Sequence, residues 1–322
     1  MKTFGLGLLL GSIITLLSFF LGSGMNIAHI NVASANINAS ENTPSANKNA
    51  NFNAQESRID PDQYINWGKL PEAMSFAGER VPLEQYDVSE RLERELLVTA
   101  FWHSKTIHIL KLSGRFLPVV EQILAKNGIP DDFKYLLMAE SGFVNATSSA
   151  GAEGYWQFME STAKEYGLEV NTYVDERYNL EKSTEAACQY FQKAYNELGN
   201  WTLAAAAYNT GRSNMKSAME RQDEKNYYNL YLNSETWRYV FRVLAFKEIY
   251  NYPEKFGYYL QSDEIYTPHN FTTVEVNSIA SITDFAKKYG TTYKNIKLLN
   301  PWMQNTSVPA NKGKVYQVKV PL

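Results

Sequence analysis

Glu140 is the residue whose type and position most favour chemistry. It follows Phe133, Leu136 and Leu137 at the i, i+3, i+4 and i+7 spacing of one helical face, which is the face expected to meet the core. Loss of water and the negative end of a helix both favour the protonated form of a carboxyl group. A carboxylic acid that stays protonated near neutral pH is what a general acid for glycosidic cleavage requires.

The sequence around Glu140 predicts the helix that positions it. Pro130 suits a first helical position, the two aspartates that follow it favour the positive helix end, and Gly142 is a typical stop. We therefore expect Glu140 in the last turn of a helix over residues 130–140.

Other helices are predicted along most of the chain. Apolar periodicity and stop signals predict helices over Ser89 to Asn127, Ser161 to Tyr166, Ser183 to Leu198, Thr202 to Asn209 and Glu235 to Tyr250. Between Asp60 and Pro253 no run shows convincing strand alternation. The expected fold class is therefore mainly α for the large domain.

The pattern changes after a tyrosine-rich joint at residues 256–266. Phe271 to Val276 and Lys314 to Val320 have strand character, while Ile282 to Tyr289 and Tyr293 to Leu299 have helical character. This order predicts a small α+β (βααβ) domain, which suits binding better than catalysis.

Composition limits the classes of function. The 322 residues are 44% hydrophobic and 14% aromatic, which is enough for a real core, and the net charge of −3 gives no basic field for nucleic acid. The four histidines form no metal-ligand spacing, and no glycine loop followed by lysine is present for phosphates. We expect no metal, no cofactor and no nucleic-acid partner.

The amino terminus indicates export. Phe4 to Leu21 is almost wholly apolar behind Lys2, which predicts a signal peptide or uncleaved membrane anchor over residues 1–24. Residues 25–58 are rich in Asn, Ala and Ser and are expected to be a tether. The single cysteine, Cys188, is expected in a helical core, so lipidation and a disulfide are not expected.

Several blocks around Glu140 resemble the lytic transglycosylases with a goose-lysozyme-like (SLT) catalytic domain, most closely the membrane-bound type D members. The matching blocks are Tyr135 to Phe143, Ser148 to Met159, Ser183 to Ala187, and Asn200 to Gly211. The likeness covers roughly Arg115 to Tyr250. It implies a lysozyme-like helical domain within residues 59–255, preceded there by a helical extension, and a place in the bacterial envelope (periplasm), soluble or anchored.

The resemblance also implies a reaction. Peptidoglycan would be cut at the β-1,4 bond between N-acetylmuramic acid and N-acetylglucosamine, without attack by water, to leave a 1,6-anhydro end. Glu140 would act first as acid and then as base. Ordinary glycosidases use two carboxylates, and the nearest rivals here, Glu153 and Asp175, lack a comparable apolar setting. Glu153 is expected to be a solvated loop charge.

Further site residues follow from the resemblance. Ser148 would hold an acetamido or lactyl oxygen or serve as a turn residue, and Gly151 and Gly154 would let the backbone approach the sugar or serve turn geometry alone. Gln157 would hydrogen-bond substrate. Met159 would pack on a sugar face or, with Trp156, belong to the core.

Three residues from later helices complete the implied site. Tyr208 and Asn209 match a Tyr-Asn pair at a helix end, where the phenol would bond Glu140 or substrate, and Tyr239 resembles a later family tyrosine. Asp175 and Arg177 match a pair expected to be scaffolding.

The last domain, residues 256–322, resembles LysM, a small fold that binds chains containing N-acetylglucosamine. The likeness lies in Lys287 to Thr292, Leu299 to Pro301 and Val318 to Pro321, while Ile279 to Ile282 replaces the usual Gly-Asp-Thr-Leu turn. Glycan binding there would raise the local concentration of substrate for the catalytic domain.

Two other functions remain open. The same fold with attacking water would be a hydrolytic muramidase or a chitinase, and the product would carry an ordinary reducing end. A glycan-binding scaffold without activity would bind and not turn over. Peptidoglycan strands are the expected partner in each case except the chitinase.

Overall fold

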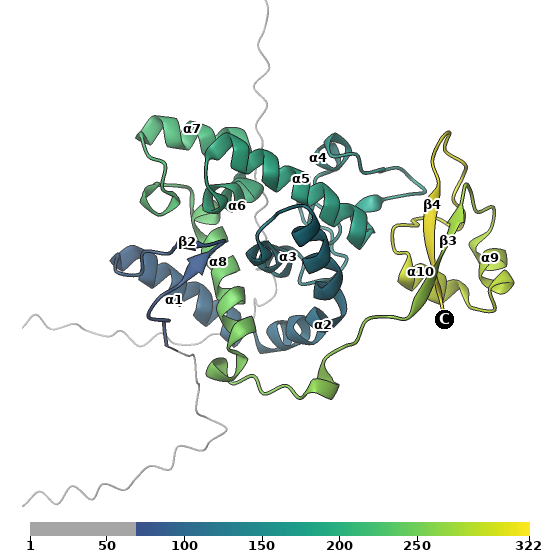
Figure 1. Cartoon of the computed structure of the whole chain (residues 1–322), viewed down its shortest axis with the longest axis horizontal. Helices are drawn as coiled ribbons and strands as arrows, with labels where there is room; N and C mark the ends of the chain where they lie inside the picture. The colour runs from purple at the N-terminus through teal and green to yellow at the C-terminus, as the bar shows by residue number, and fades with distance from the viewer. Residues whose placement is uncertain (1–68) are drawn as a thin grey trace, which may run out of the picture. The chain divides into compact units, whose positions relative to one another are not determined.

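The computed structural model describes residues 69–322 and is mainly helical (Figure 1), as expected. The predicted signal or anchor, residues 1–24, and the predicted tether, residues 25–58, lie outside the described residues. Within the described part, no helix combines the length and the apolar character needed to cross a membrane.

Eight helices of the described residues precede the last domain. They are α1 (Tyr86–Phe101), α2 (His103–Lys126), α3 (Lys134–Glu140), α4 (Glu160–Glu165), α5 (Leu180–Leu198), α6 (Trp201–Thr210), α7 (Arg212–Gln222) and α8 (Ser234–Asn251). Asparagine side chains cap the amino ends of α5, α6 and α8 by accepting a backbone N–H. Gly199 follows the last residue of α5 with a φ of 88°, which ends that helix at the predicted place.

The structure corrects three expectations about elements. The helix expected over residues 89–127 is two helices that break at Trp102, and Pro118 lies inside α2 without ending it. Helix α7 was not predicted, since its sequence is polar with a weak apolar stripe. A two-stranded hairpin also exists, β1 (Ser75–Phe76) with β2 (Glu79–Arg80), and its strands are too short for alternation to be visible in sequence.

The start of the predicted Glu140 helix also differs. Pro130 precedes a short 3-10 turn, Asp131–Phe133, which leads directly into α3. Pro130 has an extended backbone with ψ of 139°, so it caps the turn and does not occupy a first helical position. The helical end is as expected, because Glu140 is the last residue of α3.

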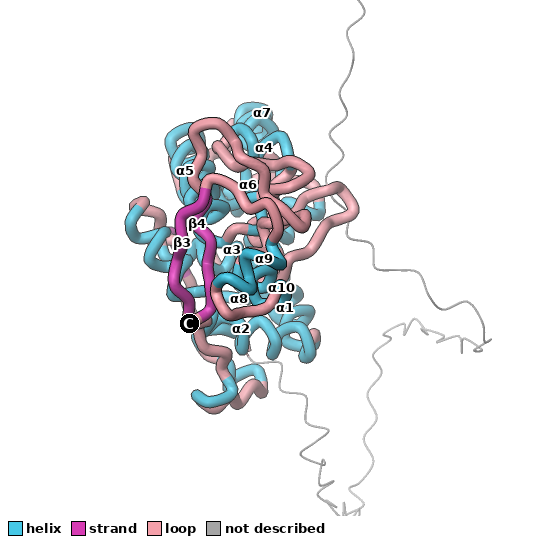
Figure 2. The backbone as a smooth tube through the Cα atoms, turned by 90° about the vertical axis from the view of Figure 1, so that its right-hand side faces the viewer, coloured by secondary structure: helices cyan, strands magenta, loops and turns pink. Residues whose placement is uncertain are grey.

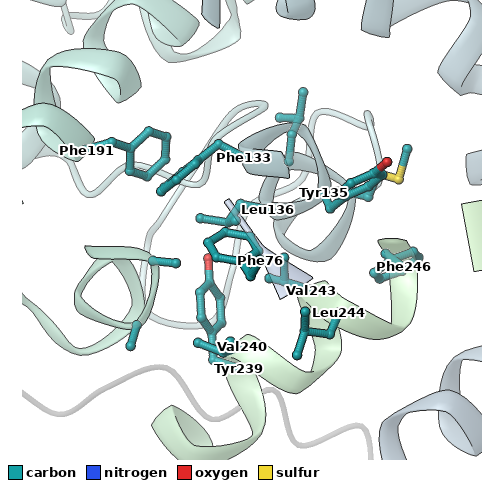
Figure 3. Close-up of a cluster of buried hydrophobic side chains, with 14 of the residues drawn as sticks. Phe76, Phe133, Tyr135, Leu136, Phe191, Tyr239, Val240, Val243, Leu244 and Phe246 are labelled. Atoms are coloured by element: carbon teal, nitrogen blue, oxygen red, sulfur yellow. The ribbon is translucent and has the colours of Figure 1, made fainter. Parts of the chain in front are cut away.

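The main core holds α3 against α8. Phe133 is fully buried, and its ring contacts those of Phe76, Phe191 and Trp201 at centroid distances of 4.5 to 5.4 Å. Figure 3 shows Phe133 and Leu136 in one cluster with Tyr239 of α8. This packing places the end of α3 beside the first half of α8.

The last domain has its own core and the predicted βααβ order. Strand β3 (Phe271–Val276) pairs antiparallel with β4 (Tyr316–Pro321), so that Phe271 faces Pro321, and Figure 2 shows the two strands side by side. Helices α9 (Ile282–Lys288) and α10 (Tyr293–Leu299) lie between them in sequence. One residue from the helical region, Val174, is buried in this second core.

Replacing Phe133 should test the packing that carries α3. Phe133→Ala removes a fully buried ring, and we expect it to lower the free energy of unfolding by about 3–5 kcal/mol. Phe271→Ala is the matched control, because that ring is 36% exposed and its loss should cost well under half as much. Urea denaturation followed by circular dichroism measures both, and equal losses would contradict the packing described.

Candidate active site

The carboxyl group of Glu140 is placed by the end of α3. Gly142 has a φ of 60°, and its N–H donates to the carbonyls of Leu137 and Met138, which closes the helix immediately after Glu140. A β-carbon at Gly142 would lie 2.8 Å from Cδ1 of Ile109, so a side chain there would make Ile109 shift, and the positive φ already favours glycine. Glu140 itself is partly buried, with an opening to solvent.

Tyr239 of α8 is the direct partner of Glu140. Its hydroxyl donates a hydrogen bond to Oε1 of Glu140 at 2.5 Å, and the tyrosine is only 2% exposed. Burial, together with the nearby carboxyl, holds the pKa of Tyr239 well above its ordinary value. The phenol is therefore a permanent donor to this carboxyl at physiological pH.

The surroundings raise the pKa of Glu140 to about 7. Burial is the main cause, and the negative charge of Glu235 adds to it, while the Tyr239 hydrogen bond and the positive charge of Arg242 act in the opposite direction. Near neutral pH both protonation states are thus well populated. Such a group can give a proton and then take one back.

Arg242 and Glu235 were not identified from the sequence, although their spacing contains a signal. They stand three residues after and four residues before Tyr239, so all three side chains share one face of α8. Once Tyr239 is placed against Glu140, its neighbours on that face must lie close enough to influence the carboxyl.

Tyr208 does not contact Glu140 directly. Its hydroxyl donates to the backbone carbonyl of Trp156 at 2.7 Å, so the phenol fastens the loop before α4. The predicted bond of this phenol to substrate stays a prediction. Asn209 accepts a hydrogen bond from the hydroxyl of Thr236 at 3.2 Å and so links α6 to α8. The contact with the carboxyl belongs to Tyr239.

The loop that precedes α4, residues 148–158 and called here the glycine loop, is held by its own polar side chains. The Ser148 hydroxyl accepts from the N–H of Ala152 at 2.9 Å, which is the turn role. The amide nitrogen of Gln157 donates to the carbonyls of Ala146 and Gly154 at 2.8 and 2.9 Å. For Gln157 the amide oxygen is then the group left to meet a ligand.

Gly154 is required by the close approach of another part of the protein, and its predicted approach to a sugar stays a prediction. Its φ is 79°, and a β-carbon there would lie 2.1 Å from the carbonyl oxygen of Arg177. Gly151 has a φ of 83° with open space around it, so only its backbone conformation demands glycine. Close approach of the loop to residue 177 is what fixes Gly154.

Trp156 and Met159, both considered for the core, differ in their burial. Trp156 is fully buried, and its indole N–H donates to the hydroxyl of Thr184 at 2.9 Å, so it belongs to the core. Met159 is 42% exposed and stands at the start of α4, outside the core.

Glu153 is not a solvated loop charge, which corrects that expectation. Its Oε2 accepts from Arg177 at 2.8 Å and from the Tyr178 hydroxyl at 3.0 Å. Arg177 is buried and also pairs with Asp175 at 2.6 Å, which agrees with the scaffolding role expected for that pair. The two nearest acidic rivals of Glu140 are therefore bound to one guanidinium group.

Metal binding and thiol chemistry both find little support in the described residues. Residues 69–322 contain no group of three or more His, Cys, Asp or Glu side chains that could hold a metal ion. Cys188 is buried within α5, and burial raises the pKa of its thiol to about 12, which fits the core role expected for it.

Comparison with curated proteins finds similar proteins. The chain is 25% identical over 246 residues to the membrane-bound lytic murein transglycosylase D of Escherichia coli, a match to 74% of this chain and 53% of the relative. The chain thus spans about half the length of the curated relatives it matches.

Two solved structures are also similar. The 70 kDa soluble lytic transglycosylase of Escherichia coli is 16% identical with a TM-score of 0.38, over 55% of this chain and 33% of that one. The lytic transglycosylase Slt of Pseudomonas aeruginosa is 20% identical with a TM-score of 0.35, over 49% and 28%.

Family models match both parts of the chain. Residues 119–231 match the transglycosylase SLT domain, and residues 272–322 match the soluble lytic transglycosylase C-terminal LysM-like domain. Both resemblances drawn from the sequence are thereby confirmed. Glu140 lies within the region that matches the SLT domain, and the region that matches the LysM-like domain follows it.

Proposed function

We propose that this chain is a peptidoglycan lytic transglycosylase that cleaves the β-1,4 bond between N-acetylmuramic acid and N-acetylglucosamine. The observation that carries the proposal is Glu140, a partly buried carboxyl with a pKa of about 7 and a hydrogen bond from Tyr239. The match of residues 119–231 to the SLT domain and the names of the Escherichia coli relatives support the same reaction.

One carboxyl serves both proton transfers in this mechanism. Protonated Glu140 donates to the glycosidic oxygen as the bond from C1 of the muramic sugar breaks. The resulting carboxylate then takes the proton of the C6 hydroxyl as O6 bonds to C1, which closes the 1,6-anhydro ring. Glu140 ends protonated, as it began, and no water is consumed.

Tyr239 acts between these two steps. Its hydroxyl donates to Glu140, and this bond favours the carboxylate over the acid. It therefore stabilises the charged form that exists only after the first transfer. Burial favours the acid, and the balance of the two keeps the carboxyl usable in both directions.

Substrate contacts belong to the same proposal. Met159 is exposed and can pack on a sugar face, and Ser148, Gln157 and Asn209 offer polar groups for the substrate. Gly154 and Tyr208 act indirectly, by shaping and fastening the glycine loop. The catalytic domain is assigned to residues 59–255 and the LysM-like domain to residues 256–322.

The cellular site is proposed from two observations. Residues 4–21 are apolar behind a lysine, which suits export, and the relatives are described as membrane-bound. We place the chain in the bacterial envelope, where its substrate is.

Hydrolysis by the same fold is the alternative reaction, and the chemical end of the product distinguishes the two reactions. A hydrolytic mechanism of the usual kind needs a second carboxylate to activate water. Glu235 is the acidic group that influences Glu140, and its own carboxylate lies 3.5 Å from the guanidinium of Arg242. Its pairing with arginine favours an electrostatic role over that of a base.

The change Glu140→Gln should abolish cleavage without unfolding the protein. The amide cannot donate and reclaim the proton, so we expect a loss of at least about a thousandfold in turnover, since general acid and base roles are combined in one group. Mass spectrometry of digested sacculi measures anhydro ends, which lack one water relative to reducing ends. Reducing ends from the wild type would contradict the proposed reaction, and full activity in the variant would remove Glu140 from it.

The same variant should be more stable than the wild type at alkaline pH. The pKa of Glu140 is about 7 in the folded chain against an ordinary 4.5, so the folded state holds its proton more tightly. Wild-type stability therefore falls as pH rises through this window, and Glu140→Gln lacks that loss. Because one pKa unit corresponds to about 1.4 kcal/mol, we expect the variant to be more stable by up to about 3 kcal/mol above neutral pH, with the difference vanishing at low pH. Thermal unfolding over a pH series measures it.

Tyr239→Phe should move the pH profile. Without the hydroxyl, the pKa of Glu140 rises further, so the fall of kcat/KM with increasing pH shifts to higher pH. The carboxylate also loses its donor, and kcat should drop roughly ten- to hundredfold. Tyr208→Phe is the matched control, because the Tyr208 hydroxyl bonds the carbonyl of Trp156. We expect this control to lose activity while the pH at which its kcat/KM falls stays at the wild-type value. If kcat/KM of Tyr239→Phe fell at the same pH as that of the wild type, the role given to Tyr239 would be refuted.

A further inference from the structure

The connection between α4 and α5 includes a hairpin, residues 169–178, called here the interdomain hairpin. Val170 pairs with Asp175 as an antiparallel bridge, and the N–H of Asn171 donates to the carbonyl of Val174 at 2.7 Å. The hairpin can be followed in Figure 1 between α4 and α5. Its tip lies in the other domain, because Val174 is 1% exposed within the core of the LysM-like domain.

Backbone pairing joins the hairpin tip to the segment after α10. Val174 forms an antiparallel bridge with Met303, the N–H of Asp175 donates to the carbonyl of Trp302 at 2.9 Å, and the N–H of Gln304 donates to the carbonyl of Tyr173 at 2.9 Å. The two domains therefore share a small piece of sheet and one apolar core. Such a junction fixes register as well as contact.

Ion pairs surround this junction. Lys314 contacts the carboxylates of Glu169 at 2.6 Å and Glu176 at 3.0 Å, and the Tyr316 hydroxyl donates to Glu169 at 3.1 Å. Lys319 of β4 contacts Glu181 of α5 at 2.6 Å. Burial acts to raise the pKa of Glu169, yet the ammonium group of Lys314 holds that pKa below its ordinary value. Positive charge on the LysM-like domain is thus matched to negative charge on the SLT domain.

The other end of the hairpin holds the glycine loop. The guanidinium of Arg177 bonds Glu153 at 2.8 Å and the carbonyl of Phe158 at 3.2 Å, and the carbonyl of Arg177 accepts from the N–H of Tyr155 at 3.3 Å. That same carbonyl occupies the space that Gly154 leaves free. The hairpin consequently fixes both the backbone and the charge of this loop.

The glycine loop in turn reaches the neighbourhood of Glu140. The carbonyl of Trp156 accepts from Tyr208, and the charge of Glu140 is felt at that phenol. A chain of direct contacts therefore runs from the LysM-like core through the hairpin and the glycine loop to Tyr208, and the phenol of Tyr208 is close enough to Glu140 to interact with it electrostatically.

We propose that the LysM-like domain positions the catalytic loop: by holding Val174 and the charges beside it, it keeps the interdomain hairpin, and through Arg177 the glycine loop, in the shape that cleavage needs. This rests on the proposed function, since turnover is its readout. A glycan anchor would help only with polymeric substrate, because it raises local concentration without changing the site. A positioning domain is needed for short substrates as well.

The experiment compares full-length variants on a short, uncrosslinked muropeptide and on sacculi. Val174→Asp places a carboxylate in the shared core, and Leu322→Asp makes the same type of change at a side chain that is 86% exposed. We expect Val174→Asp to lower kcat on the short muropeptide roughly ten- to hundredfold, because small displacements of a catalytic constellation are that costly. Leu322→Asp should keep wild-type kcat on both substrates.

A charge exchange keeps the test meaningful if Val174→Asp fails to fold. Lys319→Glu opposes Glu181 and should lower kcat on the short muropeptide severalfold, while Lys319→Glu combined with Glu181→Lys restores the attraction and should restore kcat. Amide hydrogen exchange provides a second readout. Exchange should quicken in residues 148–158 in Lys319→Glu and return to the wild-type rate in the double variant.

Two results would overturn the proposal. One is wild-type kcat on the short muropeptide in Lys319→Glu and in folded Val174→Asp, with losses confined to sacculi, which is the behaviour of a glycan anchor. The other is a loss in Lys319→Glu that the exchange does not restore. Failure of the proposed function is distinct from both, because the wild type would then give no anhydro product from either substrate.

Discussion

The competition between burial and a single hydrogen bond at Glu140 is the constraint on which the rest depends. Burial alone would leave the carboxyl protonated and unable to act as a base, whereas full solvation would leave it ionised and unable to act as an acid. Tyr239 and Arg242 oppose the burial, and the resulting pKa of about 7 lies between those limits. This balance holds only while α3 ends at Glu140 and α8 packs beside it with Tyr239 bonded to the carboxyl.

Aromatic packing holds the amino-terminal end of α3 in this arrangement. Phe133 ends the 3-10 turn before the helix and is enclosed by Phe76, Phe191 and Trp201, so α3 is held in place where it begins. On the other side, Tyr208 and Trp156 hold the glycine loop by a hydrogen bond between a phenol and a backbone carbonyl. Rigid support on both sides is what keeps a carboxyl partly dry while it remains open to a ligand.

Helices and their ends could be predicted well from the sequence because their signals are local. The stop at Gly142, the last-turn place of Glu140 and the βααβ order all follow from periodicity and glycine positions. The partner of Glu140 could not be predicted, since Tyr239 lies ninety-nine residues away along the chain and is chosen by tertiary packing. The same holds for Glu153, whose loop sequence suggested solvent and whose partner, Arg177, lies on a different segment. The break between α1 and α2 at Trp102 could not be predicted either, because no glycine or proline stands at that position.

The burial of Val174 in the second core has a consequence for how this protein can be divided. If the chain were cut at residue 256, the terminal fragment would have a cavity in its core where the Val174 side chain packs. The helical fragment would expose the apolar tip of the interdomain hairpin to water. The two pieces are therefore halves of one folding unit at this seam, and a sequence change that repacks one of them is constrained by the other. An exchange of the LysM-like domain for another terminal domain would therefore require a matching change in the interdomain hairpin.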